Sequence, residues 1–320
     1  MITFLLRRLL LSTLLLFIIS LISFFIMTLT PGSPYPWGEM NPKVSPELKA
    51  VFRKKFHLDR PLPLQYCSML DDLFRGKLCS ISDDLPVLRK IFDRLPATLS
   101  LNITAMLLFL SFGTLLGVYS ARHLGDWKDM LASLLAFLFI ALPSFWIAYL
   151  LILLLVDHLG IPILGTESYG IDFPNLLAAW LDKIWHLMFP ALILALTPLA
   201  IESRYLRASM LEELKEAYIL TARARGLSES TIFYHHALKN SLRPLITNIG
   251  MLLPALMGGT VIIESIFAYP GMGQLGYQAV LERDYPMLLT LNFIVATLVL
   301  LGNFIADLLY ALIDPRVRLD

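Results

Sequence analysis

Three glycines near the carboxyl end have the spacing of a nucleotide-binding fingerprint. Gly271, Gly273 and Gly276 form a Gly-x-Gly-x-x-Gly pattern, in which a backbone turn approaches the pyrophosphate of a dinucleotide. That chemistry requires a preceding strand and a following helix in a soluble βαβ unit, whereas these glycines follow Phe267 and Pro270 at the end of an apolar segment. We therefore expect them to shape a tight turn and not to hold a cofactor.

Other patterns that support catalysis or metal binding are missing from the sequence. It has no Gly-x-x-x-x-Gly-Lys-Ser/Thr loop, so we expect any ATP-derived energy to come from another chain. Its histidines show no i,i+4 pair and no carboxylate partner at ligand spacing, and the neighbours His235 and His236 point to different helix faces. We therefore predict no metal site, no cofactor and no enzymatic activity of the chain itself.

The scarcity of charged residues indicates which kind of secondary structure the chain forms. Of the 320 residues, 57% are apolar and 16% are charged, and the net charge of +1 argues against a strongly basic nucleic-acid binder. Six runs of 18 or more residues contain no Asp, Glu, Lys or Arg, and a bilayer core about 30 Å thick needs about 20 apolar residues. Their unbroken apolar character favours helices over barrel strands. We predict an all-α integral membrane protein with six transmembrane helices, near residues 9–30, 97–120, 131–156, 187–202, 245–269 and 287–311.

The distribution of Lys and Arg predicts the orientation of these spans. With the N-terminus in the cytoplasm, thirteen of the 26 basic residues fall on the inner side, and the two short outer loops hold only Lys183 and Arg283. The remaining eleven lie in the loop between the first two spans, which is too long to obey the positive-inside rule. We expect both termini on the cytoplasmic side.

Small and polar residues within the spans suggest how the helices are held. Gly113 and Gly117 form a Gly-x-x-x-Gly face that allows close helix packing. Glu264 is an acid in an apolar span, where it acts as a proton relay or as an internal tie; we favour the tie because no second carboxylate or lysine lies at matching depth. Prolines interrupt three spans, which fits both the broken helices of transporters and ordinary kinks. They are Pro143, Pro190, Pro198 and Pro254.

The long outer loop, residues 31–96, is expected to fold as a lid or docking element. Ser45 can cap a helix that has Pro46 at its first position, a second helix is expected to end at Gly76, and a third follows. Their apolar stripes are Leu48, Val51, Phe52 and Phe56; Leu64, Cys67, Leu70 and Phe74; and Val87, Ile91 and Leu95. Cys67 and Cys79 could pair in an oxidising periplasm or remain free thiols, and the sequence leaves both open.

The loop between the fourth and fifth predicted spans, residues 203–244, has the pattern of a docking platform. Together with Glu202 it carries seven basic and five acidic residues. Residues 211–218 are expected to continue the preceding helix beyond the membrane, Gly226 can reverse the chain, and Ser228 can cap a second short helix. We interpret the loop as a docking site, with a solvated basic face as the alternative.

The same loop carries a motif that resembles a known family. Tyr218-Ile-Leu-Thr-Ala-Arg-Ala-Arg-Gly226-Leu-Ser228, followed by His236-Ala-Leu-Lys-Asn240 and Pro244, is similar to the cytoplasmic signature loop of ATP-binding-cassette importer permeases of the dipeptide, oligopeptide and nickel group. Other segments resemble the first-type permease subunit of that group along nearly the whole chain. They are Arg7-Arg8, Thr30-Pro-Gly32, Leu58-Asp-Arg-Pro-Leu-Pro-Leu-Gln-Tyr66, Arg94-Leu-Pro-Ala-Thr98, Glu264-Ser-Ile-Phe267, Pro270-Gly-Met-Gly273, Arg283-Asp-Tyr-Pro286 and Asp314-Pro-Arg316.

The resemblance implies a type I importer permease fold with both termini cytoplasmic. The chain would divide into the N-terminus and first helix (1–30), a periplasmic loop subdomain (31–96), a permease core (97–311) with its coupling loop (203–244), and a cytoplasmic tail (312–320). The residues implied to couple the loop to an ATPase are Tyr218, Thr221, Ala222, Arg223, Ala224, Arg225, Gly226, Leu227, Ser228, His236 and Asn240. Candidates for the translocation path or its gate are Glu264, Phe267, Pro270, Gly271, Gly273 and Asp284.

The resemblance also implies a machine of several subunits in the bacterial cytoplasmic (inner) membrane. Its other parts would be a second, homologous permease subunit, two cytoplasmic ATP-binding-cassette ATPases and an extracytoplasmic solute-binding protein; the lipid bilayer is a partner and nucleic acid is not. Di- or oligopeptides are the expected substrates, with nickel or another small solute as the alternative.

A proton-driven secondary transporter with Glu264 as relay is a hypothesis of a different class, which predicts an internal repeat and several buried carboxylates. A non-transporting assembly scaffold would explain the platform but not the proline-interrupted spans.

Overall fold

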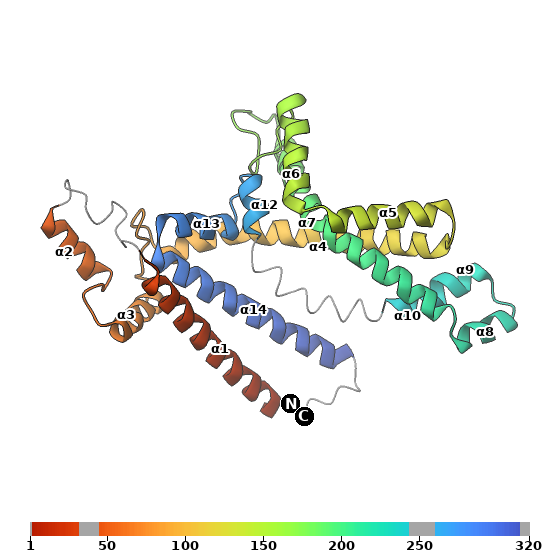
Figure 1. Ribbon diagram of the computed structural model, residues 1–320, viewed down its shortest axis with the longest axis horizontal. Helices are drawn as coiled ribbons and strands as arrows, with labels where there is room; N and C mark the ends of the chain where they lie inside the picture. Colours follow the sequence, from red (N-terminus) through yellow and green to blue (C-terminus); the bar gives the residue numbers. More distant parts are fainter. Residues whose placement is uncertain (1, 32–44, 243–259, 314–320) are drawn as a thin grey trace. The chain divides into compact units, whose positions relative to one another are not determined.

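The computed structural model describes residues 2–31, 45–242 and 260–313, and helices dominate it (Figure 1). Among these residues no β-strand occurs, although Cys79 and Pro86 form an isolated antiparallel bridge. The chain divides into two compact units, each described by itself. The first contains Met1–Thr98, Met257–Val261 and Gly271–Asp320, and the second contains Leu99–Leu256 and Ile262–Pro270.

The first unit is built on two helices from opposite ends of the sequence. α1 (Ile2–Leu29) and α14 (Tyr285–Ile313) lie side by side (Figure 1). The other elements of this unit are α2 (Pro46–Lys55), α3 (Leu62–Phe74), the first turns of α4 (Val87–Arg122) and α13 (Met272–Glu282).

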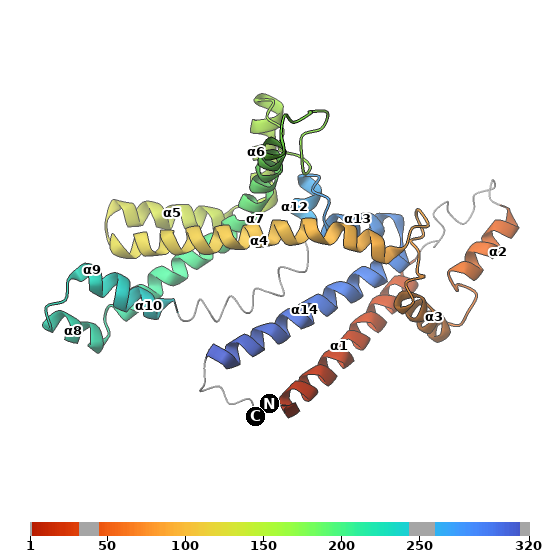
Figure 2. The same cartoon turned by 180° about the vertical axis from the view of Figure 1, so that it is seen from behind.

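The second unit contains the remainder of α4 and the helices that follow it. α5 packs against α7, as Figure 2 shows. The elements in order are α5 (Trp127–Ala141), α6 (Ser144–Ile152), the π-helix η1 (Leu153–His158), α7 (Leu176–Glu213), α8 (Ala217–Ala224), α9 (Glu229–Thr231), the π-helix η2 (Ile232–Ala237), α10 (Leu238–Ser241) and α12 (Val261–Ile266).

Several helices are long and apolar enough to cross a membrane. Four qualify singly, and the pair Trp127–Ala141 and Ser144–His158, bent by 96°, makes a fifth if it is counted as one span. The predicted all-helical architecture is confirmed for the described residues, whereas the span near 245–269 lies largely outside them, so the number six stays a prediction. The four single spans are Leu10–Leu29, Val87–Arg122, Leu176–Glu213 and Tyr285–Phe304.

The prolines interrupt only one of the described spans. Pro143 lies at the bend between α5 and α6, and Leu142 before it is extended, which is the conformation favoured in front of a proline. Pro190 and Pro198 lie inside α7, which continues through both. The fourth predicted span is therefore part of a longer continuous helix, and Pro254 lies outside the described residues.

The outer-loop helix α2 begins as the sequence predicts. The Ser45 hydroxyl accepts a hydrogen bond from the backbone N–H of Leu48 at 3.2 Å, which caps the first turn. Phe52 and Phe56 are buried, but Leu48 and Val51 are exposed. The predicted four-residue stripe is thus wrong at two positions, because α2 contacts the rest of the unit through only a narrow strip.

The predicted stripe of α3 is wrong at three of its four positions, and only Leu70 packs against the interior, where it is half-buried. Leu64, Cys67 and Phe74 are exposed, and the buried residues are Gln65, Tyr66, Met69 and Leu73. Two adjacent faces of α3 are apolar in sequence, and a tertiary contact selects between them. The hydroxyl of Tyr66 makes a buried 2.6 Å hydrogen bond to Ser20 of α1.

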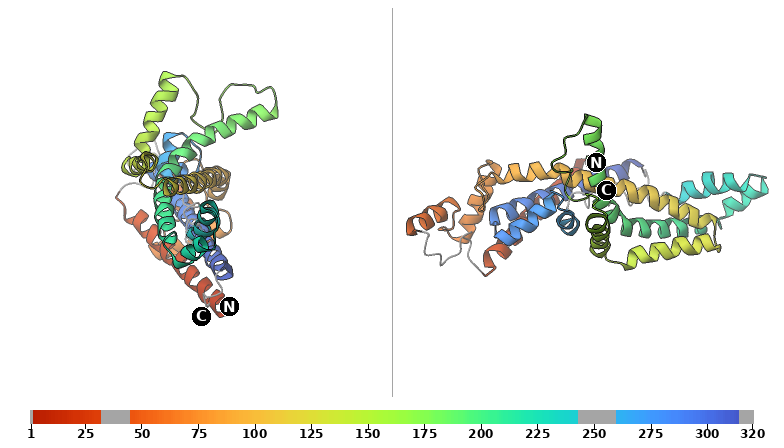
Figure 3. Two further views of the ribbon diagram at one scale, coloured as in Figure 1. Left: turned by 90° about the vertical axis from the view of Figure 1, so that its right-hand side faces the viewer. Right: turned by 90° about the horizontal axis from the view of Figure 1, so that it is seen from above.

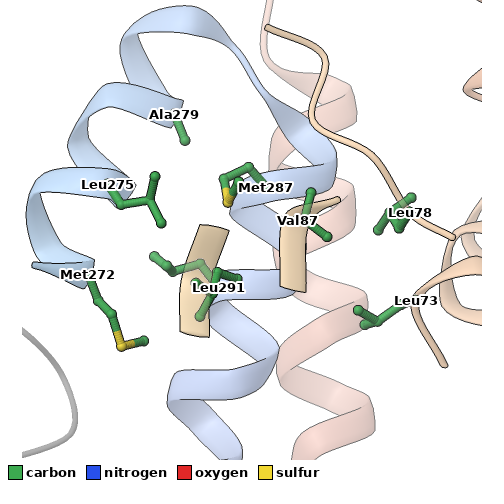
Figure 4. Packing of buried hydrophobic residues seen from close by; sticks show 9 residues of the cluster. Leu73, Leu78, Val87, Met272, Leu275, Ala279, Met287 and Leu291 are labelled. Atoms are coloured by element: carbon green, nitrogen blue, oxygen red, sulfur yellow. The ribbon is translucent and has the colours of Figure 1, made fainter. Parts of the chain in front are cut away.

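The third predicted loop helix is the beginning of α4. Val87 and Ile91 are fully buried, as their spacing predicts, but their helix runs on into the second span without a break. They contact apolar side chains of α13 and α14 in one cluster (Figure 4). The clustered residues labelled with Val87 are Leu73, Leu78, Met272, Leu275, Ala279, Met287 and Leu291.

The Gly-x-x-x-Gly face of α4 packs closely on α7, as predicted. A Cβ atom on Gly113 would lie 3.1 Å from the Cβ of Glu202, and one on Gly117 would lie 2.7 Å from the backbone oxygen of Ser203. At Gly117 only glycine fits against the α7 backbone without a shift, and at Gly113 a larger residue would be tightly packed.

We predict that Gly117→Ala destabilises the protein despite the higher helix propensity of alanine. The methyl group meets backbone, and overpacking of about 1–3 kcal/mol exceeds the gain of about 1 kcal/mol in helix propensity. Thermal unfolding of the purified protein in detergent measures the change, with Leu115→Ala on the exposed face of α4 as control. Unchanged or increased stability of the glycine variant would contradict the close packing.

Candidate functional site

The loop after α7 forms a compact platform, defined here as residues 214–242. Its first part corrects the prediction that residues 211–218 continue one helix. The backbone N–H groups of Lys215 and Glu216 bond to the oxygens of Glu212 and Glu213 at 3.0 and 3.1 Å, so the last turn tightens and α7 ends. Glu216 is extended, and α8 begins after it.

The platform has two arms, α8 before Gly226 and the run from α9 to α10 after it. Gly226 reverses the chain between them. Its φ is +79°, in the region that favours glycine, and its N–H bonds to the oxygen of Arg223 at 2.9 Å. The next helix starts as predicted, because the Ser228 hydroxyl accepts a hydrogen bond from the N–H of Thr231 at 3.3 Å. The predicted helix–Gly–helix arrangement is therefore present in the fold.

The platform has its own apolar core on the ends of α4 and α7. Ile219 of α8 and Ile232 of η2 are fully buried, together with Leu206 of α7. The two arms, drawn in teal, lie beside each other at the end of α7 (Figure 3). Because their apolar faces bury each other and α7, the platform is packed directly on that helix.

Polar contacts tie the arms together at both ends. The Tyr218 hydroxyl donates to the Glu213 carboxylate and accepts from the Asn240 amide at 2.8 Å. Burial of the ring and the neighbouring Glu213 carboxylate raise the pKa of the Tyr218 hydroxyl above its ordinary value. At the other end, Arg223 of α8 donates two hydrogen bonds, of 2.8 and 3.1 Å, to Glu229 of α9.

Most of the predicted coupling residues lie on the open surface of the platform. Thr221, Arg223, Ala224, Arg225, Gly226, Leu227 and Ser228 are exposed, and Tyr218 is 37% exposed. Ala222 is instead buried in the apolar core, and His236 is half-buried. Leu220, 59% exposed beside these residues, was not among the predicted positions. The open surface thus combines two exposed leucines with two arginines.

A buried ion pair joins the helices beneath the platform. Arg207 of α7 donates two hydrogen bonds, of 2.8 and 2.7 Å, to the carboxylate of Asp129 on α5. Ser120 of α4 and the N–H of Gly125 donate to the same carboxylate. Three helices therefore meet at Asp129, whose residue surface is 5% exposed. Sequence reasoning missed this contact, because the two residues are far apart in the chain.

The end of α4 also contacts the platform directly. Arg122 donates a 2.6 Å hydrogen bond to the hydroxyl of Tyr234 in η2 and lies over its ring. This second connection shows that α4, as well as α7, positions the platform.

The predicted translocation-path residues fall in both units. In the second unit, Glu264 and Phe267 are fully buried, and the Phe267 oxygen accepts a hydrogen bond from the N–H of Gly165 at 2.8 Å. Pro270 is half-buried at the end of this unit.

In the first unit, Asp284 is buried and accepts hydrogen bonds from Ser80 and from the N–H groups of Ile81 and Met287. Gly271 precedes α13 and Gly273 lies inside that helix. The expected tight turn at the three glycines is therefore wrong for Gly273 and Gly276, which are buried within α13. A Cβ on Gly276 would lie 2.9 Å from Leu291 of α14, so this helix approaches its neighbour closely there.

Two histidines have carboxylate partners that the sequence reasoning missed. The Nε2 atom of His57 lies 2.7 Å from an oxygen of Asp72, and Nδ1 of His186 lies 3.6 Å from one of Asp182, four residues earlier on α7. Asp182 also accepts two hydrogen bonds from Ser168 at 2.7 Å. Among the described residues, no three His, Cys, Asp or Glu side chains are grouped to hold a metal ion.

The two cysteines, which the sequence left open, are both free thiols in the structure. Cys67 is exposed on α3, and the sulfur of Cys79 lies 3.5 Å from the backbone oxygen of Lys77. Neither side chain contributes to the candidate site.

Comparisons with known proteins cover both ends of the chain. A family model described as binding-protein-dependent transport system inner membrane component matches residues 113–319, and the model of the corresponding N-terminal region matches residues 1–102. The oligopeptide transport system permease protein AppB of Bacillus subtilis is 37% identical over 321 residues, 99% of this chain and 100% of that protein. The di/tripeptide permease DppB of Pseudomonas aeruginosa is 36% identical and the dipeptide permease DppB of Escherichia coli K12 is 34% identical, each over 336 residues and 99% of both chains.

We predict that Asp129→Ala lowers the free energy of unfolding by about 2–3 kcal/mol, because it leaves the Arg207 guanidinium partly buried without its carboxylate. Chemical unfolding in detergent measures the loss. Asp126→Ala, an exposed neighbour without a side-chain cap bond, is the control. Replacing both members of the pair by leucine should restore part of the stability, and a single variant as stable as the control would contradict the proposed tie.

We further predict that Tyr218→Phe loosens the platform without affecting membrane insertion. The change removes the hydrogen bond that Tyr218 donates to Glu213 and the one that it accepts from Asn240. In the wild-type chain these contacts stabilise the arms by about 1 kcal/mol. Amide hydrogen exchange in α8 and α10 should accelerate several-fold. Tyr205→Phe is the control, since within the described chain that hydroxyl has no hydrogen bond. Equal exchange in both variants would show that the contact does not order the platform.

Proposed function

Because the chain belongs to the family of binding-protein-dependent transport system inner membrane components, we propose that it is the transmembrane permease subunit of an ATP-driven importer of di- and oligopeptides. The observation that carries the proposal is full-length similarity, at 34–37% identity, to proteins named as oligopeptide, di/tripeptide and dipeptide permeases. Those names favour peptides over nickel as the cargo. The family is a membrane component and not an ATPase, so ATP hydrolysis belongs to other subunits.

We propose that the platform is where a cytoplasmic ATPase subunit docks. Its exposed leucines, Leu220 and Leu227, offer apolar contact, and Arg225 beside them offers a positive charge, whereas Arg223 is paired with Glu229. The core and the Tyr218 contacts hold this surface firmly on α7 and α4, so a change in the ATPase can move those helices. If the ATPase pair binds one arrangement of the two platforms more tightly than another, its binding shifts the permease toward that arrangement. The size of the shift is set by the difference between the two binding free energies.

The proposed assembly has two permease subunits, two ATPases and an extracytoplasmic binding protein. In it the chain crosses the bacterial inner membrane six times, with one span near 245–269, and both termini and the platform face the cytoplasm. The excess of basic residues in the predicted inner segments supports this orientation. The loop of residues 31–96 then lies outside, where the binding protein delivers its ligand.

We assign Glu264 a structural role near the translocation path. Its side chain is completely buried, as expected of an internal tie. A proton-driven transporter would need a relay of several such acids. Membership of a binding-protein-dependent family supports an energy source in partner subunits instead.

We predict that Gly226→Val uncouples ATP hydrolysis from uptake. Valine is strained at a φ of +79° by about 1–3 kcal/mol, so the turn between the arms deforms although no atom lies within 4 Å of the new Cβ position. The complex reconstituted in vesicles should keep basal ATP hydrolysis and lose at least tenfold of its peptide uptake.

Gly170→Val is the matched control, because Gly170 has a φ of +73° and equally open surroundings in the loop before α7. It should retain uptake and stimulated hydrolysis. Normal uptake by the Gly226 variant would overturn the docking assignment. Purification of the wild-type chain without ATPase subunits and a second permease would overturn the proposed assembly.

A further inference from the structure

The first unit contains an open hollow that has no role in the function proposed above. Its volume is about 460 Å³, and it lies between the turn before α4, the first turns of α4, and α13 with the start of α14. Ligand pockets commonly have about 300–1,000 Å³. The charged side chains that line it are Asp83, Lys90, Asp93, Arg94, Glu282 and Asp284.

Part of this charge is already neutralised within the unit. Lys90 donates a 2.6 Å hydrogen bond to Asp83. Partial burial opposes ionisation of Asp83, but the bonds from Lys90 and from the N–H of Leu85 hold its pKa below the usual value. Asp284 is occupied by its three protein donors. Asp83, Lys90 and Asp284 are therefore held by other groups of the protein. The other three charged side chains of the hollow are available to a ligand.

The remaining charges have opposite signs and come from different helices. Arg94 of α4 is half-buried and Glu282 of α13 is exposed, and neither makes an ion pair or hydrogen bond with any described residue. Asp93 lies 3.9 Å from the exposed Arg89, a weak contact. Glu282 is also the last residue of α13, where the helix end adds partial negative charge. The hollow therefore offers one guanidinium and an acidic rim.

The helices that carry Arg94 and Glu282 are tied together. The Thr98 hydroxyl of α4 accepts a hydrogen bond from the N–H of Met272 at 2.7 Å, which ties α4 to the first residue of α13. Leu275 and Met287 line the hollow and belong to the apolar cluster of Figure 4. An occupant would thus meet apolar side chains between two charged ends.

We propose that this hollow binds the free ends of a short zwitterionic peptide, with Glu282 and Asp93 receiving its ammonium group and Arg94 its carboxylate. A guanidinium binds a carboxylate through two parallel hydrogen bonds, and a carboxylate attracts an ammonium. The inference rests on the proposed function in placing this hollow on the outer side of the membrane, where peptide arrives. It adds a binding site within the permease itself.

The site is tested by equilibrium binding of tritiated leucyl-leucine. The sample is the assembled complex of permease subunits and ATPases in lipid nanodiscs, without the binding protein. The wild-type complex should bind the free dipeptide at least tenfold more tightly than its N-acetylated or its amidated form. Glu282→Gln should weaken the free dipeptide about tenfold and leave the N-acetylated form unchanged, while Arg94→Gln should abolish discrimination against the amide. Glu47→Gln and Arg53→Gln, exposed on α2 outside the hollow, are the matched controls.

Equal affinity for free and blocked dipeptides, or Glu282 and Arg94 variants that behave like the controls, would overturn the inference. Uptake of leucyl-leucine into vesicles, measured with the binding protein present, separates it from the proposed function. Uptake without discriminating binding would leave the function standing and remove the site. Discriminating binding that depends on Glu282 and Arg94, without uptake of any peptide, would keep the site and remove the function.

Discussion

The Asp129–Arg207 ion pair constrains the whole second unit. Taking a carboxylate and a guanidinium out of water costs several kcal/mol unless nearly every donor and acceptor is satisfied. Here the carboxylate accepts four hydrogen bonds, two from Arg207 and one each from Ser120 and Gly125. That geometry exists only at one relative position of α4, α5 and α7, so the pair sets their register.

The platform depends on this register because it has little support of its own. α8 and α10 are short, and such helices are marginal unless their apolar faces are buried by tertiary packing. Ile219, Ile232 and Ala237 obtain that burial against Leu206 and Met210 of α7. α7 is continuous from Leu176 to Glu213, about 57 Å at 1.5 Å per residue. A displacement of the platform can therefore reach the far end of α7, where Asp182, His186 and Ser168 are hydrogen-bonded or paired.

In the first unit, buried polar contacts again decide arrangement within an apolar interior. The Tyr66–Ser20 bond orients α3 on α1, and Asp284 joins the loop near Ser80 to the start of α14. Each contact links segments that are distant in sequence. Unpaired, these buried groups would cost about 1–3 kcal/mol apiece, so the pairing selects among packings that apolar contacts alone leave similar in energy.

The sequence by itself determined the features that follow from local chemistry. Long charge-free runs require helices in lipid, Ser45 and Ser228 cap helices, Gly226 takes a left-handed turn, and Gly113 and Gly117 allow close approach; each property belongs to a residue and its neighbours in the chain. Tertiary structure alone decided the buried face of α3, the burial of Ala222, the helical state of Gly273, and the partners of Asp129 and His57. Those outcomes depend on which distant group lies opposite, and periodicity within one helix carries no information about that group.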